Sequence, residues 1–378
     1  MKAAWLRRPV LYPTELRASV NRSIPRTSSE TVANPVESAS ALLTCNVQMS
    51  LRVVALAASL AALPIAATDD GASTGVPRTQ TLAIEDGARL LVISPHPDDE
   101  VIAAGGLIQR VRTAHGDVRV VYLTDGESYQ AGVRIEEHVA DPKSSDYRVY
   151  GVHRQHEARA ALEALGVERG ALTFLGFPND GLSRLMTTYW SERRNAFVSP
   201  YTRRDRPRPS EIVVPATRYR GEDLTQELAA IIGSFHPTML AVPRKEDQHA
   251  DHCAAWYFTA DALGDVRRVE ADFHADVLNY VIHFNSWPFE DESALLPPPD
   301  LPAGPSGWLT VPLTAAEAAR KRRALQKYES QMRMMDWFLM TFARRNELFS
   351  RPPAFRIVLP IARNPCAAFA EPAAPRAK

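Results

Sequence analysis

The chain is poor in cysteine and carries no net charge. Its 378 residues include three cysteines, and 44 Lys and Arg residues balance 44 Asp and Glu residues. So few cysteines cannot build the framework of a small disulfide-stabilised protein. A balanced charge also gives no global field that would favour nucleic acid or an anionic membrane. No helix-turn-helix pattern or aromatic RNA-binding signature is present, so we expect no nucleic-acid partner.

An apolar run near the N-terminus is too short to span a membrane. It covers residues 53–65, whereas a bilayer span takes about 20 residues. A basic lead at residues 49–52 precedes it and Ala66-Ala67 follows, which is the form of a secretory signal peptide. We therefore predict a start at Met49, a signal peptide over 49–67 and export to the periplasm or the extracellular space. Residues 1–48 would then be an untranslated or disordered leader, and the mature protein would have no stable membrane span. An N-terminal anchor is the alternative.

Removing that leader leaves Cys253 and Cys366, too few for a disulfide framework. Cys253 is adjacent to His252, but successive helical residues point about 100° apart. We expect Cys253 to be a small buried residue and not a metal ligand.

The first chemically informative segment reads Pro-His-Pro-Asp-Asp-Glu at residues 95–100. It follows an apolar run at 90–93 and precedes a second one at 101–108, so the pattern predicts a buried strand over 89–94 and a helix over 99–114. One imidazole and three carboxylates at such a junction could hold a catalytic metal. A structural alternative remains open, in which Asp98 caps the helix and Asp99 and Glu100 face its dipole.

A second segment has the same form. A short predicted strand at residues 239–242 is followed by Asp-Gln-His-Ala-Asp-His at 247–252 and a helical pattern over 253–263. His249 and His252 are three residues apart, so at a helix start they share one face. If both strands lie in one sheet, His96, Asp99 and His252 can meet. Three such ligands with one open position are typical of catalytic zinc.

The order of these elements predicts an α/β protein. A further strand at 118–123 follows the first helix, which implies a right-handed crossover and parallel strands. We expect a Rossmann-like three-layer sandwich with a mostly parallel central sheet. No Gly-x-Gly-x-x-Gly follows the first strand, which disfavours nucleotide binding. The expected organisation is a linker over 68–85, a domain over 86–363 with an insertion at 183–221, and a flexible tail over 364–378. Within the domain we predict an irregular loop over 128–150, a helix over 153–165, and a helical pattern from 315 to about 345.

Together the motifs resemble those of a known family. They comprise residues 95–100, Leu-Thr-Asp-Gly-Glu at 123–127, Arg154 with Glu157, Leu-Gly-Phe-Pro at 175–178 and His-Ala-Asp-His at 249–252. Their order and spacing are similar to those of the PIG-L/LmbE-like zinc-dependent N-acetylglucosaminyl deacetylases. The resemblance implies a hydrolase that removes an acetyl group from an N-acetylated sugar in a small molecule or glycan. Export would place that substrate outside the cytoplasm.

The resemblance and the residue types together assign roles. His96, Asp99 and His252 would hold zinc or another divalent metal, and Asp98 would act as general base. His249 would stabilise the oxyanion or protonate the departing amine. By resemblance, Arg154 would contact the sugar, although it could simply pair with Glu157. Asp180 is placed where the family has a sugar-hydroxyl acceptor, but Asn179-Asp180 departs from the family's usual Pro-Asp-Gly-Gly. Alternatives are an amidase for another acylated natural product and a non-catalytic carbohydrate-binding protein.

Overall fold

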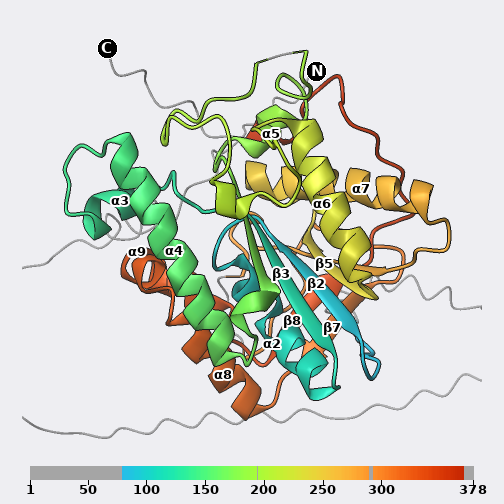
Figure 1. Cartoon of the computed structure of the whole chain (residues 1–378). Helices are drawn as coiled ribbons and strands as arrows, with labels where there is room; N and C mark the ends of the chain where they lie inside the picture. Colours follow the sequence, from blue (N-terminus) through green and yellow to red (C-terminus); the bar gives the residue numbers. More distant parts are fainter. Residues whose placement is uncertain (1–78, 194, 289–292, 370–378) are drawn as a thin grey trace, which may run out of the picture. The chain divides into compact units, whose positions relative to one another are not determined.

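An eight-stranded sheet with helices on both faces forms the centre of the protein (Figure 1). The computed structural model describes residues 79–193, 195–288 and 293–369, so the predicted leader and signal peptide lie outside the described residues. The strands are β1 (Thr79–Thr81), β2 (Arg89–Ser94), β3 (Asp117–Thr124), β4 (Leu172–Phe177), β5 (Met239–Pro243), β6 (Asp276–Tyr280), β7 (Trp308–Pro312) and β8 (Asn346–Ser350). The α-helices are α2 (Asp99–Thr113), α3 (Gln130–Glu136), α4 (Ser144–Ala164), α5 (Leu182–Leu185), α6 (Gly221–Phe235), α7 (Ala250–Val269), α8 (Ala315–Leu325) and α9 (Glu329–Thr341). The 3-10 helices are η1 (Arg169–Ala171), η2 (Pro209–Glu211) and η3 (Pro365–Phe369). None of the helices in these ranges combines the length and apolarity that a membrane span needs.

The sheet is mostly parallel. Its strand order is β1-β7-β8-β6-β5-β2-β3-β4. β8 runs antiparallel to both of its neighbours, β6 and β7, and the other neighbouring pairs are parallel. The predicted α/β class with a mostly parallel central sheet is therefore confirmed.

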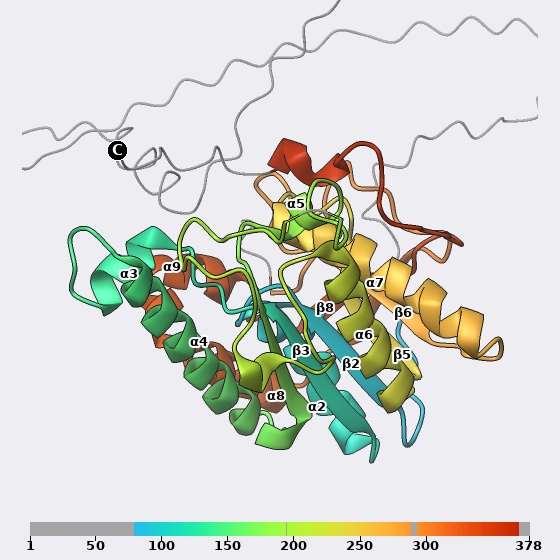
Figure 2. The same cartoon turned by 45° about the horizontal axis from the view of Figure 1, so that its top comes forward.

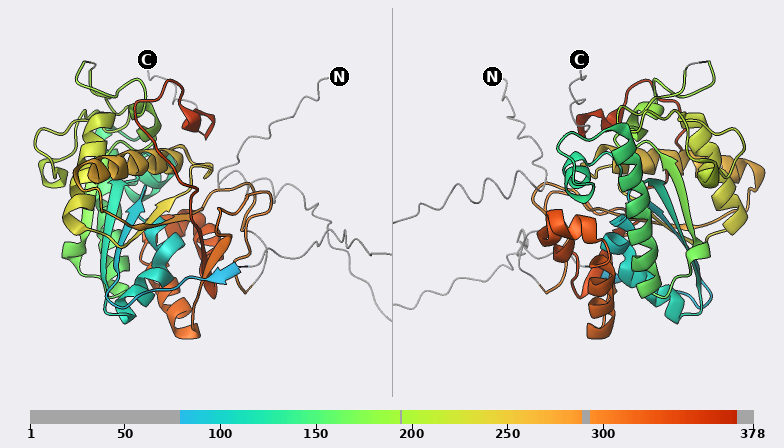
Figure 3. Two further views of the ribbon diagram at one scale, coloured as in Figure 1. Left: turned by 90° about the vertical axis from the view of Figure 1, so that its right-hand side faces the viewer. Right: turned by 60° about the vertical axis from the view of Figure 1, so that its left-hand side comes forward.

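Alternating residues of β2 show how the layers form. Leu90 and Val92 join the core on one face with α2, α4, α8 and α9, whereas Leu91 and Ile93 join the core on the other face with α5, α6 and α7. Because successive strand residues point to opposite faces, a continuous apolar run is what a strand covered on both sides requires. Figures 2 and 3 show the two helical layers from further directions.

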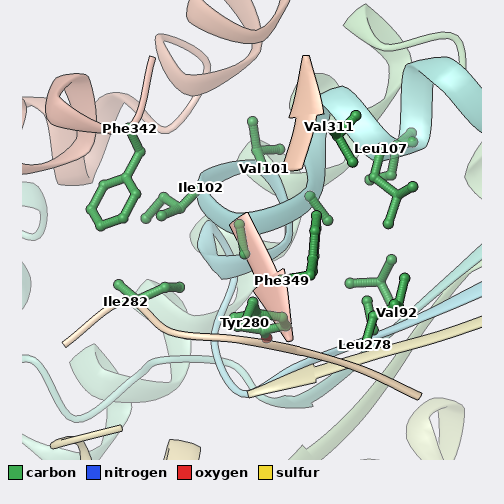
Figure 4. Packing of buried hydrophobic residues seen from close by; sticks show 14 of the residues in the cluster. Val92, Val101, Ile102, Leu107, Leu278, Tyr280, Ile282, Val311, Phe342 and Phe349 are labelled. Carbon is green, nitrogen blue, oxygen red and sulfur yellow. The ribbon is translucent and has the colours of Figure 1, made fainter. Parts of the chain in front are cut away.

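Helix α2, which follows β2, is fixed firmly within this core. Figure 4 shows Val101, Ile102 and Leu107 of α2 among the buried side chains that also include Tyr280 of β6 and Phe349 of β8. Gly106 lets the segment after β7 approach α2, since an added Cβ would lie 2.4 Å from a methyl carbon of Leu313. The first turn of α2 is thereby held at a defined position above the sheet.

Several predicted boundaries are wrong. The segment 128–150 is not an irregular loop, because it contains α3 and the start of α4, where Asp146 Oδ2 accepts a hydrogen bond of 2.7 Å from the Lys143 N–H. That cap starts the helix within a polar stretch in which apolar periodicity gives no signal. The pattern from 315 to about 345 is two helices, since Tyr328 between them has the non-helical angles φ −82° and ψ 64°. β1 lies inside the predicted linker 68–85, where it pairs with β7.

The two cysteines of the domain are bonded to one another, contrary to the prediction. Cys253 of α7 forms a disulfide with Cys366 of η3, with a Cα–Cα distance of 5.6 Å. Cys253 is buried as predicted. The segment 364–369 of the predicted flexible tail is thus covalently attached to α7, a pairing that the separation of 113 residues does not reveal.

Candidate active site

The predicted site residues follow two strands that are neighbours in the sheet. His96 and Asp98 lie in the turn after β2, and His249 and His252 lie at the start of α7 after β5. β2 and β5 are paired in parallel, so their carboxyl ends meet at one edge. Ligand sites of open α/β sheets form at this edge.

Three side-chain atoms converge at this point. Asp99 Oδ2 lies 3.1 Å from His96 Nδ1 and 3.1 Å from His252 Nε2, and the two nitrogens are 3.3 Å apart. Two ligands of a tetrahedral zinc ion at about 2.0–2.2 Å lie about 3.3 Å from each other. The three atoms therefore fit a single zinc-sized ion, and all three side chains are buried.

Two further carboxylates, which had no role in the sequence prediction, lie beside the outer ring nitrogens of His96 and His252. Asp247 Oδ2 lies 3.2 Å from His252 Nδ1, and Asp251 Oδ2 lies 3.5 Å from His96 Nε2. Both Asp side chains are fully buried. Asp247 also accepts from the backbone N–H groups of Ile282 and His249. Carboxylates behind metal-binding histidines commonly fix the ring orientation. The position of Asp247 and Asp251 beside His249 and His252 in the sequence could have indicated this role.

The electrostatic environment favours a cation. Burial lowers the pKa of His96, but hydrogen bonds to Asp251 and Asp99 outweigh it and raise this pKa to about 9. Burial raises the pKa of Asp99, yet the charge of His252 and its hydrogen bond bring it well below its ordinary value. A buried site that holds positive charge in this way suits a divalent ion.

His249 differs from the other two histidines. Burial, followed by the charges of His96 and His252, lowers its pKa well below the ordinary value. Its Nδ1 accepts a hydrogen bond of 3.2 Å from the Asp251 N–H. A neutral ring that accepts at Nδ1 carries its proton on Nε2. His249 is thus arranged as a hydrogen-bond donor, and its ring centroid is 4.6 Å from that of His96.

Asp98 lies at the N-cap position of α2 but does not cap the helix. Its side chain makes no capping hydrogen bond, and its φ of 131° is a strained value for a residue other than glycine. The carboxylate instead meets the Arg154 guanidinium at 3.1 Å. Burial raises the pKa of Asp98, the charge of Arg154 opposes this, and the result is about 7. The cap alternative for Asp98 is therefore wrong.

The two predicted sugar-binding residues occupy different environments. Arg154 is buried and donates to the carbonyls of Pro97 and Gly126 as well as to Asp98. It does not form the alternative surface pair, because Glu157 accepts from the Ser330 N–H and hydroxyl. Asp180 accepts from the Ser128 hydroxyl, and its N–H donates to Asp251 Oδ2 at 2.7 Å. Asp180 is thus connected to the histidine cluster.

A fourth histidine, His283, also lies at the site and was missed. It follows β6, which pairs with β5, and its ring stacks on Phe338. Potential ligand atoms of Asp99, His252 and His283 lie within 4.8 Å of one another, as do those of His96, His249 and His252. An isolated histidine after an ordinary strand gives no sequence signal.

Comparison with known proteins shows which family the segment carrying these residues resembles. Residues 91–263 match the profile of the family PIG-L: GlcNAc-PI de-N-acetylase. This segment of the chain is thus similar to the PIG-L family. The matched PIG-L segment contains each of the predicted metal, catalytic and sugar-binding residues.

Curated relatives of the PIG-L segment share one name, 1D-myo-inositol 2-acetamido-2-deoxy-alpha-D-glucopyranoside deacetylase. The relative from Corynebacterium glutamicum (strain R) is 28% identical over 183 residues, which is 48% of this chain and 54% of the relative. The relative from Mycobacterium sp. (strain KMS) is 33% identical over 177 residues, which is 46% of this chain and 50% of the relative. The chain thus spans about half the length of the curated relatives it matches.

Solved structures similar to this chain include N,N'-diacetylchitobiose deacetylase from Pyrococcus horikoshii. It is 17% identical with a TM-score of 0.45, and the match covers 71% of this chain and 85% of that one. A deacetylase of the teicoplanin biosynthesis pathway is 19% identical with a TM-score of 0.39, over 66% of this chain and 87% of that one.

Proposed function

We propose that this chain is a metal-dependent hydrolase that removes the acetyl group from an N-acetylglucosamine-type sugar. The observation that carries the proposal is the convergence of His96 Nδ1, Asp99 Oδ2 and His252 Nε2 within 3.3 Å of one another. These residues would hold zinc or another divalent ion. When bound, such an ion supplies Lewis-acid polarisation of the amide carbonyl and activates water.

Asp98 is the proposed general base. It adjoins the ligand Asp99, and its oxygens are not among the three converging ligand atoms. Its pKa of about 7 suits a group that must take a proton from water near neutral pH and pass it on. Arg154 would orient the carboxylate through their 3.1 Å contact.

His249 is the proposed donor on the other side of the reacting amide. Its neutral ring with a proton on Nε2 can stabilise the developing oxyanion by a hydrogen bond. The Asp251 N–H, which donates to Nδ1, maintains this tautomer. Protonation of the departing amine is the other role open to His249, since an amine leaves poorly without a proton.

The sugar substrate is inferred from the family and the curated relatives. Their printed name describes a glucopyranoside with a 2-acetamido group. Asp180, which is adjacent to the cluster through Asp251, is the proposed acceptor for a sugar hydroxyl. Arg154 donates through Nη1 and Nη2 to Asp98 and two carbonyls, so we assign it to positioning Asp98.

The disulfide supports the proposed export. Such bonds persist mainly in oxidising compartments, which include the periplasm and the extracellular space. The Cys253–Cys366 bond therefore fits a mature protein that begins after Ala67. N-terminal sequencing of the exported protein should find Thr68 as the first residue, and an intact 49–67 segment would reject the signal peptide. We propose that the deacetylase domain covers 86–363, extended to Thr79 by β1 and to Phe369 by the disulfide-bonded η3.

Acetate release tests the activity. Metal-loaded protein should release acetate from N-acetylglucosamine conjugates, and chelation should stop the release. Acetate from an N-acylated natural product but not from the sugars would favour the alternative amidase. Sugar binding without acetate release would favour a non-catalytic carbohydrate-binding protein.

A further inference from the structure

A cavity of about 420 Å³ lies beside the candidate active site. It is lined by residues after β3, by the first turns of α4 and by the insertion, including Asp125, Glu127, Tyr147, Arg148, Arg204 and Tyr219. Figure 2 shows the loops of the insertion between α4 and α6. The volume of the cavity is within the range of about 300–1,000 Å³ that is typical of small-molecule sites.

The cavity borders the proposed sugar site directly. Glu127 Oε1 accepts a hydrogen bond of 3.2 Å from the N–H of Asn179, the residue before Asp180. Ser128, which follows Glu127, donates its hydroxyl to Asp180. A group attached to a sugar at Asp180 could therefore extend past Glu127 into the cavity.

One buried atom in the cavity wall has no partner. Glu127 is 5% exposed, and its Oε2 forms no hydrogen bond with the described residues. An unsatisfied buried carboxyl oxygen is unfavourable, and a hydroxyl donor from a ligand would satisfy it. Burial raises the pKa of Glu127 to about 8 and that of Asp125 to about 7, so either group can also donate to a hydroxyl when protonated.

The arginines of the cavity are only partly neutralised. Arg208 pairs with Asp125 and Glu211. Within the described ranges, however, neither Arg148 nor Arg204 forms an ion pair, and Arg148 donates only to the Thr202 carbonyl at 2.8 Å. The half-buried Arg148 and Arg204 can therefore bind an anionic group. Tyr147 and Tyr219 supply aromatic wall surface.

We propose that this cavity binds an acidic sugar unit joined to the N-acetylated one, with its hydroxyls at Glu127 and its anionic group at Arg148 and Arg204. This inference rests on the proposed function and adds the substrate class: a glycan or glycoconjugate with a carboxylate- or phosphate-bearing neighbour.

Binding of already deacetylated disaccharides tests the subsite without turnover. Three probes, each glucosamine joined to glucose, to glucuronate or to a phosphorylated glucose, are titrated calorimetrically into the full mature protein. A charge-assisted contact should make at least one acidic probe bind about ten- to a hundredfold more tightly than the neutral one. The acid with the larger gain identifies the anion. Equal affinity for all three probes, or no binding of any, would overturn the proposal.

Variants separate the two parts of the cavity. Arg204→Ala should abolish the preference for acidic probes, whereas Arg206→Ala is a matched control in the same insertion because it pairs only with Asp205 among the described residues. Arg148→Ala, in α4, should likewise abolish the preference for acidic probes. Glu127→Gln should weaken neutral and acidic probes alike. A preference that survives both Arg204→Ala and Arg148→Ala would reject the assignment.

Acetate release from a simple N-acetylglucosamine glycoside is measured in parallel. Release without any acidic preference would leave the proposed function standing and remove the subsite. An acidic preference in binding without acetate release would support the subsite and reject the proposed function.

Discussion

His252 Nε2 lies 3.1 Å from Asp99 Oδ2, although the two residues follow different strands of the sheet. Parallel pairing of β2 with β5 brings these strand ends together, and Asp247 supports the far side of the His252 ring. The site therefore depends on the fold and cannot exist in either segment alone.

The first prediction concerns metal content. His252→Ala should lose the bound metal, because only His96 and Asp99 would remain of the three converging ligands. Elemental analysis after dialysis measures the occupancy. His274→Ala, an exposed histidine after α7, should keep the wild-type content. Full occupancy in His252→Ala would reject the ligand assignment.

The second prediction separates the general base from the ligands. Asp98→Asn should keep the metal but lower the rate of acetate release by about two to four orders of magnitude, as expected for loss of a general base. The amide keeps an oxygen for the 3.1 Å contact with Arg154, so the local structure should persist. Wild-type activity in this variant would exclude the role.

Sequence reasoning worked where one local pattern determines structure. The apolar run of β2 predicts a strand covered on both faces, and Leu90 and Leu91 indeed enter opposite cores. The carboxyl ends of β2 and β5 could be predicted to carry the site because ligands bind at that edge of parallel sheets.

The remaining features depend on partners distant in the sequence. β8 and His283 carry no local signal, and the Cys253–Cys366 bond depends on where η3 docks. Lys321 lies in a helical segment rich in charged residues. Its side chain is nevertheless fully buried, where it pairs with Glu347. Such positions are decided by tertiary packing.

The third prediction concerns pH and Glu100. Burial is the main cause that raises the pKa of this carboxyl, to about 8, despite the hydrogen bond from Tyr328. Between its ordinary value and 8 the folded state holds more protons than the unfolded state, so stability should fall as pH rises. Glu100→Gln has no ionisable group at this position, so this contribution to the pH dependence of stability is absent. The free energy of unfolding of wild type relative to the variant should decrease from pH 5 to pH 8 by on the order of a few kcal/mol. Urea unfolding of both proteins in chelator measures this, and a pH-independent difference would contradict it.

The fourth prediction concerns the disulfide. Replacing both Cys253 and Cys366 by Ser should lower the free energy of unfolding by about 2–5 kcal/mol. The bond attaches η3 to α7 next to His252, so its loss also releases a segment that packs on the helix carrying a proposed ligand. Reductant should destabilise wild type to a similar extent during urea unfolding and leave the double variant unchanged. Equal stability of wild type with and without reductant would argue against the bond.

The last prediction tests the buried ion pair of Lys321 and Glu347. Lys321 Nζ lies 2.6 Å from Glu347 Oε1, and the two side chains are 0% and 1% exposed. Glu347 also accepts from the N–H groups of Gly106 and Leu107 in α2. Lys321→Met would leave a buried carboxylate without its cation, which typically costs about 3–5 kcal/mol.

The double variant Lys321→Met/Glu347→Gln should recover much of that loss. Its glutamine is neutral but keeps one side-chain oxygen that can accept from an α2 backbone N–H, so the uncompensated charge is removed while one of the two acceptors remains. Urea unfolding of the wild type, both single variants and the double variant gives the coupling energy. Additive effects would mean that the two residues stabilise α2 independently. Strong coupling would mean that the pair acts as a unit that anchors the helix whose first turn carries Asp99.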